Sequence, residues 1–328
     1  MTATHQRDDY WADYRFTPRL IAPAESAVWV MEDHLPLLLR IAGEQSVPLP
    51  VGRRDDTIRG AHELAVDGDV VWIRWNDGIT RLDPVSESER WLPLSAASIA
   101  AGDAGVWALS GNGRVVRIDR DGGDYVTIGQ PEVRRHTIAV GHGAVWTLTW
   151  TSVPGGSTLA RVDPLSGRAT HQVAIEGSPR RLLVDSTAVW VRVWRHGEGD
   201  AVEEILVRVE PESVEATGEI TVSPTGSGGP VVDGVLWAPN VDPYDHDMRG
   251  EPCEVRRIDA ASGELRGVVA APGWVTSMVA GPGGVWGVLE RPGGDAGAVI
   301  ELATGGRSLR IVDVRDADVS SHLGARRG

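Results

Sequence analysis

Residues 137 to 175 of the sequence, TIAVGHGAVWTLTWTSVPGGSTLARVDPLSGRATHQVAI, decide the fold. They contain short runs rich in Val, Ile, Leu, Thr and Trp, separated by turns containing Gly, Pro, Asp or Ser. Strand-length apolar runs bounded by such residues indicate an antiparallel meander rather than helices. The stretch therefore predicts one four-stranded sheet, and its length of about 40 residues is that of a propeller blade.

The same unit recurs along the chain, and a Trp at the end of the second run marks each copy. The marker is Trp29, Trp72, Trp107, Trp146, Trp190, Trp237 and Trp286. An apolar residue stands eight positions before the Trp in six copies, at Ile21, Leu64, Ile99, Ile138, Leu182 and Met278, and the sixth copy is shortened there. The repeat predicts an all-β fold, a seven-bladed β-propeller of four-stranded antiparallel blades.

A second column lies in the third run of each copy. It is Arg40, Arg81, Arg117, Arg161, Arg208 and Arg257, with Glu301 in the seventh copy. An acidic residue follows two positions later in most copies, as in Asp83 and Asp163. We expect these side chains to cap turns and to tie neighbouring blades together, without a catalytic role.

The repeat covers the chain well enough to indicate one closed ring rather than two ordinary domains, because a blade buries its faces only against its neighbours. We expect an N-terminal arm at residues 1–16, a single propeller domain at 17–314 and a C-terminal tail at 315–328.

Composition excludes several classes of function. The net charge is −14, and the sequence contains no Lys and a single Cys. This composition argues against a nucleic-acid surface, a Schiff-base lysine, an internal disulfide and a four-thiolate zinc site. The polar N-terminus does not resemble a signal peptide, and no apolar run is long enough to span a bilayer. We expect a cytoplasmic monomer that meets neither nucleic acid nor membrane and acts on a small-molecule or peptide substrate.

The antiparallel order places the loops between second and third strands on one face of the ring, together with the links from blade to blade. These loops vary in length and carry most of the exposed His and Trp, whereas the turns on the opposite face are short. Variable loops on a regular scaffold are the usual place for function.

The first strands converge on a central funnel, and two columns of residues lie at its mouth. Ten positions before the marker Trp stand Arg19, His62, Ala97, His136, Arg180 and Thr276, and the next column holds Glu63, Ser98, Thr137, Arg181 and Ser277. Imidazoles can transfer protons, and arginines can bind a carboxylate or hold developing negative charge. The alternative is that polar residues merely line a wet funnel.

The variable loops supply further candidates for ligand binding. Trp75, Trp150 and Trp194 follow a marker Trp by three or four residues, so they could form an aromatic wall for a planar or glycosidic ligand. His34 and His196 lie in the loops of the first and fifth copies, and the fifth loop could close over a ligand. Packing between blades and a simple exposed insertion are the competing interpretations.

The sixth loop is the densest acidic segment, with Asp242, Asp245 and Asp247. Oxygen ligands at short spacing suit magnesium or calcium, but the spacing does not match a twelve-residue calcium loop. A solvated acidic loop is the preferred interpretation, so we expect no cofactor and keep magnesium or calcium as the alternative. The motifs of serine hydrolases, zincins and dinucleotide-binding proteins are absent from the sequence.

The units GPGGVWGVLE (residues 281–290) and GHGAVWTL (residues 141–148), with third runs of the RIDxxSG type, resemble the streptogramin (virginiamycin) B lyase and YncE-like group. The resemblance spans nearly the whole chain. It implies a seven-bladed propeller, and in the lyases a few His and Glu act with magnesium to open a cyclic depsipeptide by elimination. Their repeat tends to read LWFTE. No copy here reads WFTE, although Glu32 matches its Glu slot and Glu290 lies one residue beyond it.

Two functions follow as hypotheses. The first is an enzyme that transforms a small metabolite or cyclic peptide by elimination, cyclisation or isomerisation. His136 and His62 would exchange protons, Glu63 or Glu32 would orient them or hold a metal, and Arg180 and Arg181 would bind an acidic group, with Arg19 and Ser277 beside them. The second is a non-catalytic propeller that binds a ligand or protein partner through its Trp-bearing loops.

Overall fold

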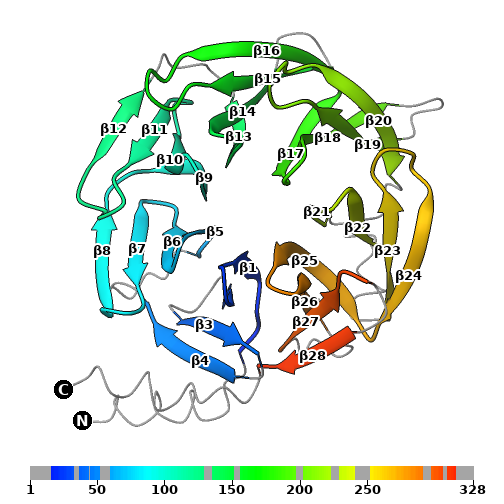
Figure 1. Cartoon of the computed structure of the whole chain (residues 1–328). Coiled ribbons are helices and arrows are strands. Elements are labelled where there is room, and N and C mark those ends of the chain that lie inside the picture. Colours follow the sequence, from blue (N-terminus) through cyan, green and yellow to red (C-terminus); the bar gives the residue numbers. More distant parts are fainter. Residues whose placement is uncertain are drawn as a thin grey trace, which may run out of the picture.

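The computed structural model describes residues 16–32, 37–43, 45–51, 60–128, 135–150, 156–196, 202–222, 229–240, 252–290, 297–305 and 309–314, without the side chains of 135 and 136. These residues form seven four-stranded antiparallel sheets arranged as blades in a ring (Figure 1). The predicted fold class is confirmed.

Each blade is built from consecutive strands. Blades 1 and 2 are β1 (Leu20–Pro23), β2 (Val28–Met31), β3 (Leu37–Ala42), β4 (Gln45–Pro50), and β5 (Glu63–Asp67), β6 (Val70–Arg74), β7 (Ile79–Asp83), β8 (Ser88–Leu92). Blades 3 and 4 are β9 (Ala96–Gly102), β10 (Gly105–Ser110), β11 (Val115–Ile118), β12 (Tyr125–Ile128), and β13 (Arg135–Gly141), β14 (Ala144–Trp150), β15 (Gly156–Val162), β16 (Ala169–Glu176). Blade 5 is β17 (Ser178–Val184), β18 (Val189–His196), β19 (Val202–Val209) and β20 (Ala216–Val222). Blades 6 and 7 are β21 (Val231–Val232), β22 (Val235–Pro239), β23 (Cys253–Asp259), β24 (Leu265–Ala271), and β25 (Trp274–Gly281), β26 (Gly284–Glu290), β27 (Ala298–Ala303), β28 (Leu309–Asp313).

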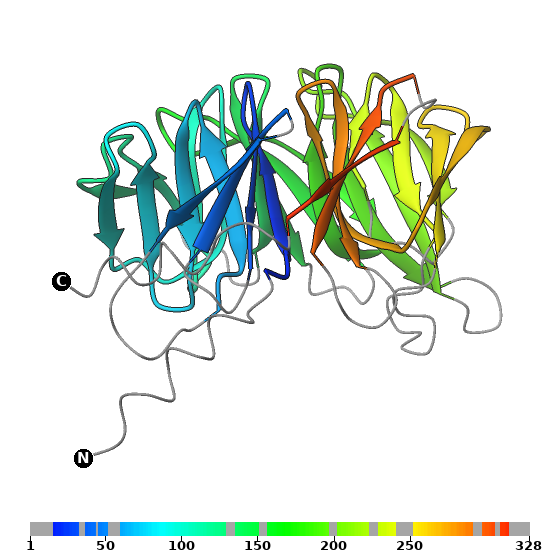
Figure 2. The ribbon, with the colours of Figure 1, turned by 90° about the horizontal axis from the view of Figure 1, so that it is seen from below.

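The strand order within each sheet follows the sequence, with the first strand at the central opening and the fourth at the rim (Figure 1). Figure 2 shows that the strands run from one face of the ring to the other. We call the face where first strands begin and second strands end the mouth face, and the opposite one the turn face. The shortened sixth copy is also confirmed, because β21 has two residues.

The marker tryptophans hold the blades together. All seven are buried, and each lies in a different hydrophobic cluster between its own blade and the next. Burying a Trp side chain removes about 150–250 Å² from water, which is worth up to about 4–6 kcal/mol. Four of the indole N–H groups also donate to the preceding turn, as Trp146 Nε1 does to the Gly141 carbonyl at 3.0 Å.

The arginine column is the cross-strand partner of the Trp column. Trp190 pairs with Arg208 and Trp237 with Arg257, and each guanidinium lies over the indole ring, 5.9 and 5.2 Å from its centre. Arg257 also donates to the Thr304 and Gly305 carbonyls of blade 7, and Arg81 Nε donates to the Arg120 carbonyl of blade 3 at 2.7 Å. These contacts confirm that the column ties neighbouring blades together.

The acidic residues two positions later cap the turns between third and fourth strands. Asp163 Oδ1 accepts from the N–H groups of Leu165 and Ser166, and Asp83 makes the same contacts in its own turn. These hydrogen bonds lower the pKa of both carboxyl groups. The predicted capping role is confirmed.

The ring closes by side-chain packing, because blades 1 and 7 each contain four consecutive strands. Val28, Leu39, Trp286 and Val299 share one cluster with Phe16, the last residue of the expected N-terminal arm, which is fully buried there. Arg310 Nη1 donates to the Gly43 carbonyl at 2.8 Å across the same interface.

The role of the marker tryptophans predicts a large difference between two residues of β14. Trp146→Ala should lower the free energy of unfolding by about 3–5 kcal/mol, because it leaves a cavity between blades 4 and 5. Trp150→Ala should cost less than about 1 kcal/mol, because its side chain is 39% exposed. Urea unfolding followed by tryptophan fluorescence measures both, and equal losses would contradict the assignment.

Candidate functional site

A recurring β-bulge shapes the mouth of the central opening. The ladder between first and second strands shifts register at Ala97, His136, Arg180 and Thr276, which all belong to the column ten positions before the marker Trp. In blade 2 the His62 N–H donates to the Arg74 carbonyl at 2.9 Å, although Glu63 is the ladder partner of Arg74. Bulges redirect side chains and are common beside functional sites. The two columns therefore lie where the regular ladder breaks. The side chain of the predicted His136 lies outside the described residues.

Below this mouth runs a channel of about 320 Å³, lined by the innermost strands of all seven blades. Apart from Arg181, its lining residues stand six to eight positions before the marker Trp and are apolar, among them Ala65, Ala101, Val140, Leu183 and Met278. Arg181 is the charged side chain among the described residues that line it.

Arg181 belongs to a cluster of three arginines on blade 5. Arg180 stacks on Trp194, with its Cζ 3.6 Å from the ring centre. Arg192 is the ladder partner of Arg181, and its Nη2 lies 2.5 Å from Glu204 Oε1, both side chains being buried. Within the described residues, Arg192 Nε is buried without a hydrogen-bond partner. The cluster thus concentrates positive charge around one buried carboxylate.

Burial and mutual repulsion set the pKa values in this cluster. Burial lowers the pKa of Arg192; the carboxylate of Glu204 opposes that shift, whereas Arg181 and Arg180 add to it. Burial also raises the pKa of Glu204, against the pull of Arg192 and Arg180. The pKa of Arg181 is lowered because the inner strands surround it, although its surface is exposed to the channel, and the charge of Glu63 opposes that shift. An anion at the mouth would relieve the repulsion among these cations.

Glu63 faces the mouth from blade 2 and is held by Arg74 of its own blade and by two groups of blade 3. It accepts from the Ile99 N–H at 2.8 Å, from Ser98 Oγ at 3.0 Å and from Arg74 Nε at 3.2 Å. Burial raises its pKa, and the hydrogen bond from Ile99 and the charge of Arg74 oppose the rise. These contacts make Glu63 a link between blades 2 and 3 as well as a mouth residue.

Two other predicted residues also have partners within the protein. Arg19 Nη1 lies 3.1 Å from Glu290 Oε1, so this pair joins blades 1 and 7 at the mouth face. Glu32 is buried and accepts from the Thr17 N–H at 3.3 Å.

The predicted histidines and tryptophans are spread over the mouth face. His62 Nε2 lies 2.6 Å from Asn76 Oδ1, and His196 is exposed at the end of β18. Trp75 is buried between blades 1 and 2, where its Nε1 donates to Thr80 Oγ1 at 2.9 Å. Trp150 is exposed, whereas Trp194 lies under Arg180. Trp75 therefore packs between blades, as the competing interpretation expected. Trp194 instead contacts the arginine cluster through Arg180.

The other predicted positions add little to the mouth. Ser277 is half-buried on β25, beside the bulge at Thr276. His34, Asp242, Asp245 and Asp247 lie outside the described residues. Among the residues that are described, no group of three or more His, Cys, Asp or Glu could hold a metal ion.

Arg74, Arg192 and Glu204 were not predicted as site residues, and Glu290 was noted only for its place one residue beyond the Glu slot of the lyase repeat. Arg192 interrupts an otherwise apolar second strand, VWVRVW, and this interruption was the available signal for a buried charge. Its partner Glu204 lies on β19, beyond a loop, so the sequence offered no way to pair the two.

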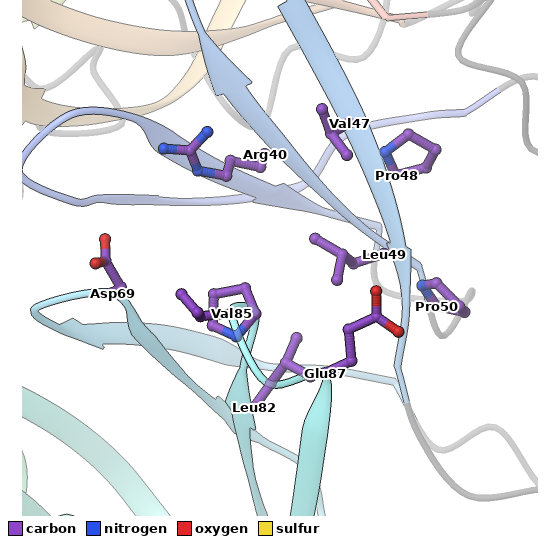
Figure 3. A pocket seen from close by; sticks show the side chains of 10 residues that line it. Arg40, Val47, Pro48, Leu49, Pro50, Asp69, Leu82, Val85 and Glu87 are labelled. Carbon is purple, nitrogen blue, oxygen red and sulfur yellow. The ribbon is translucent and has the colours of Figure 1, made fainter.

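A second cavity, of about 600 Å³, lies between blades 1 and 2, away from the mouth (Figure 3). It is lined by β4 and by two turns, and it combines Arg40, Asp69 and Glu87 with apolar side chains. Pro48 and Pro50 occupy β4, the outer strand of blade 1. Prolines weaken pairing along an exposed sheet edge, so they protect this rim from association.

Comparison with known proteins establishes the fold. No family model matches the chain, and no curated protein does. Among solved structures, Kuenenia stuttgartiensis hydrazine synthase aligns with a TM-score of 0.62 at 11% identity, over 91% of this chain and 96% of that one. Dihydro-heme d1 dehydrogenase NirN aligns with a TM-score of 0.55 at 10% identity, over 92% of this chain and 66% of that one. The extracellular domain of the putative one component system BT4673 from B. thetaiotaomicron gives 0.56 at 16%, over 90% and 40%.

These neighbours include two enzymes and the extracellular domain of a one component system, so the propeller alone does not select a function. The part of the chain that the structure describes contains no helix able to cross a membrane.

The raised pKa of Glu63 predicts a pH dependence of stability. Between its ordinary value of 4.5 and its higher folded value, the folded protein retains a proton that the unfolded chain has lost. The contribution of Glu63 to the free energy of unfolding therefore falls as pH rises through this window. Glu63→Gln removes this contribution and should flatten the profile measured by urea unfolding between about pH 4.5 and 7. Glu264→Gln, at an exposed position on blade 6, is the matched control and should keep the wild-type slope.

Proposed function

We propose that the protein binds a small acidic molecule at the mouth of its central channel, where Arg180 and Arg181 hold the negative charge. The observation that carries this proposal is the arginine cluster of blade 5, in a chain whose net charge is −14. A local excess of positive charge in an acidic protein attracts anions to one place on its surface.

The arrangement of the cluster supports the proposal further. Trp194 holds the guanidinium of Arg180 against its ring, so one of the two proposed binding arginines is oriented before a ligand arrives. Glu204 holds the guanidinium of Arg192, the ladder partner of Arg181. Such preorganisation reduces the entropy lost on binding. A planar guanidinium with fixed orientation suits a carboxylate or phosphate group, which it can bind through two hydrogen bonds.

Removing the charge of either arginine should weaken anion binding. Arg180→Gln and Arg181→Gln should each raise the Kd for acetate, benzoate or inorganic phosphate by about tenfold or more, because a hydrogen bond to a charged group is worth about 1.5–3 kcal/mol. Isothermal titration calorimetry at low salt measures the effect.

Arg266→Gln is the control for this experiment, because Arg266 is on β24, the outermost strand of blade 6. It should bind like the wild type. Equal affinities in all four proteins, or no binding of any of these anions, would reject the proposal.

Catalysis on the bound molecule is the second candidate. The specific observation in its favour is the His62 ring, whose Nε2 is held 2.6 Å from Asn76 Oδ1 on the mouth face. In this version His62 and His136 exchange protons in an elimination, cyclisation or isomerisation, and the resemblance to the streptogramin B lyase group adds a cyclic peptide to the substrates considered. Glu63 and Glu32, which accept hydrogen bonds within the protein, would position other groups rather than transfer protons.

The two candidates differ in the fate of the ligand. If the protein is catalytic, mass spectrometry of a ligand incubated with it should show a new product, and His62→Ala and His136→Ala should each slow its formation by about 10²-fold or more while the Kd stays within a factor of about three. A ligand recovered unchanged from the wild-type protein supports binding alone.

A further inference from the structure

The walls of the channel carry information about the ligand that the arginines alone do not. Arg181 lies at the mouth end of the lining, and the next three positions along each first strand are apolar. Alanine dominates the middle layer, with Ala22, Ala65, Ala100 and Ala139 at the same position in blades 1 to 4. A ligand anchored at Arg181 therefore reaches directly into a space bounded by apolar side chains.

The backbone adds a second kind of contact. Each innermost strand is an edge strand of its sheet. It pairs with a neighbouring strand on one side only, so its other edge faces the channel. An unpaired strand edge presents N–H and C=O groups at regular spacing. The channel thus combines apolar side chains with hydrogen-bonding backbone, which is the combination that an extended peptide presents in return.

Acidic side chains are frequent beside the first strands on the turn face, where Asp67 is paired with Arg120, whereas blade 5 places Arg180 and Arg181 at the mouth. The turns that follow the first strands on the turn face carry Glu25, Asp67, Asp103, Asp185 and Asp233. A carboxylate would be repelled there and attracted by Arg180 and Arg181 at the mouth. This arrangement favours entry of an acidic ligand from the mouth face.

We infer that the ligand is a short peptide with a free α-carboxylate and apolar C-terminal residues, the carboxylate at Arg180 and Arg181 and the side chains in the channel. The inference rests on the proposed anion-binding function and names its ligand class. A channel of about 320 Å³ is at the lower end of the range for small-ligand sites, so the part of the peptide enclosed is short.

Three matched ligands test the inference on the wild-type protein. The first, N-acetyl-Val-Val with a free carboxylate, carries all the expected features. The second, N-acetyl-Val-Val amide, lacks the negative charge. The third, hexanoate, has the charge and an apolar chain but no peptide groups. Calorimetry should show that N-acetyl-Val-Val with its free carboxylate binds at least about tenfold more tightly than either its amide or hexanoate. In Arg181→Gln the advantage of the acid over its amide should disappear, whereas Arg266→Gln should preserve it.

A channel variant separates this inference from the proposed function. Ala101→Leu narrows the channel and should weaken binding of N-acetyl-Val-Val about tenfold while leaving acetate binding unchanged. Ala216→Leu, at an exposed position of β20, is the matched control and should leave both unchanged. If Ala101→Leu does not fold, the comparison of the three ligands on the wild-type protein still tests the inference.

The outcomes that overturn the inference are distinct. Hexanoate binding as tightly as the peptide would replace the peptide with a simple amphipathic acid. A peptide that binds no better than acetate, with both depending on Arg181, would exclude the channel and leave the anion site standing. Absence of any arginine-dependent binding would reject the proposed function together with the inference.

Discussion

A four-stranded sheet has two faces to bury, and in this protein each face can be buried only against the neighbouring blade. The marker tryptophans meet that constraint, because each fills the interface between its own blade and the next. The last interface joins residues from the two ends of the chain, so the central channel exists only when the whole ring is closed. Every residue discussed at the mouth depends on this closure, since blades 2 and 5 meet there from distant parts of the sequence.

The fold could be predicted because the constraint repeats. Trp146 and Arg161 recur as columns because they are cross-strand partners in the same place in each blade, and a repeated contact leaves a repeated sequence. The mouth columns could be placed for the same reason. Their bulges could not, because Arg180 and Arg181 look alike in a sequence and differ in structure through one shift of register.

The partners at the mouth were beyond prediction for a different physical reason. Glu63 is held by donors from the next blade, and Arg192 finds Glu204 across a loop, so each contact occurs once and leaves no periodic trace. The environments of the tryptophans that follow the marker tryptophans were likewise beyond prediction from the sequence. Trp150 and Trp194 both stand four residues after their marker, yet Trp150 is exposed and Trp194 supports an arginine.

Departures from the repeat are therefore the informative positions for function. A residue present in every blade serves the ring, whereas a residue confined to one blade must be explained by what that blade does. Among the described first and second strands, only those of blade 5 bring three arginines together, namely Arg180, Arg181 and Arg192. The adjoining blade 6 has the shortest innermost strand described. Concentrating like charges at one point of a ring costs electrostatic energy. In a chain with a net charge of −14, such a cluster beside an apolar channel has a repulsion that an acidic ligand would relieve. This supports the proposed anion recognition over a general wet lining.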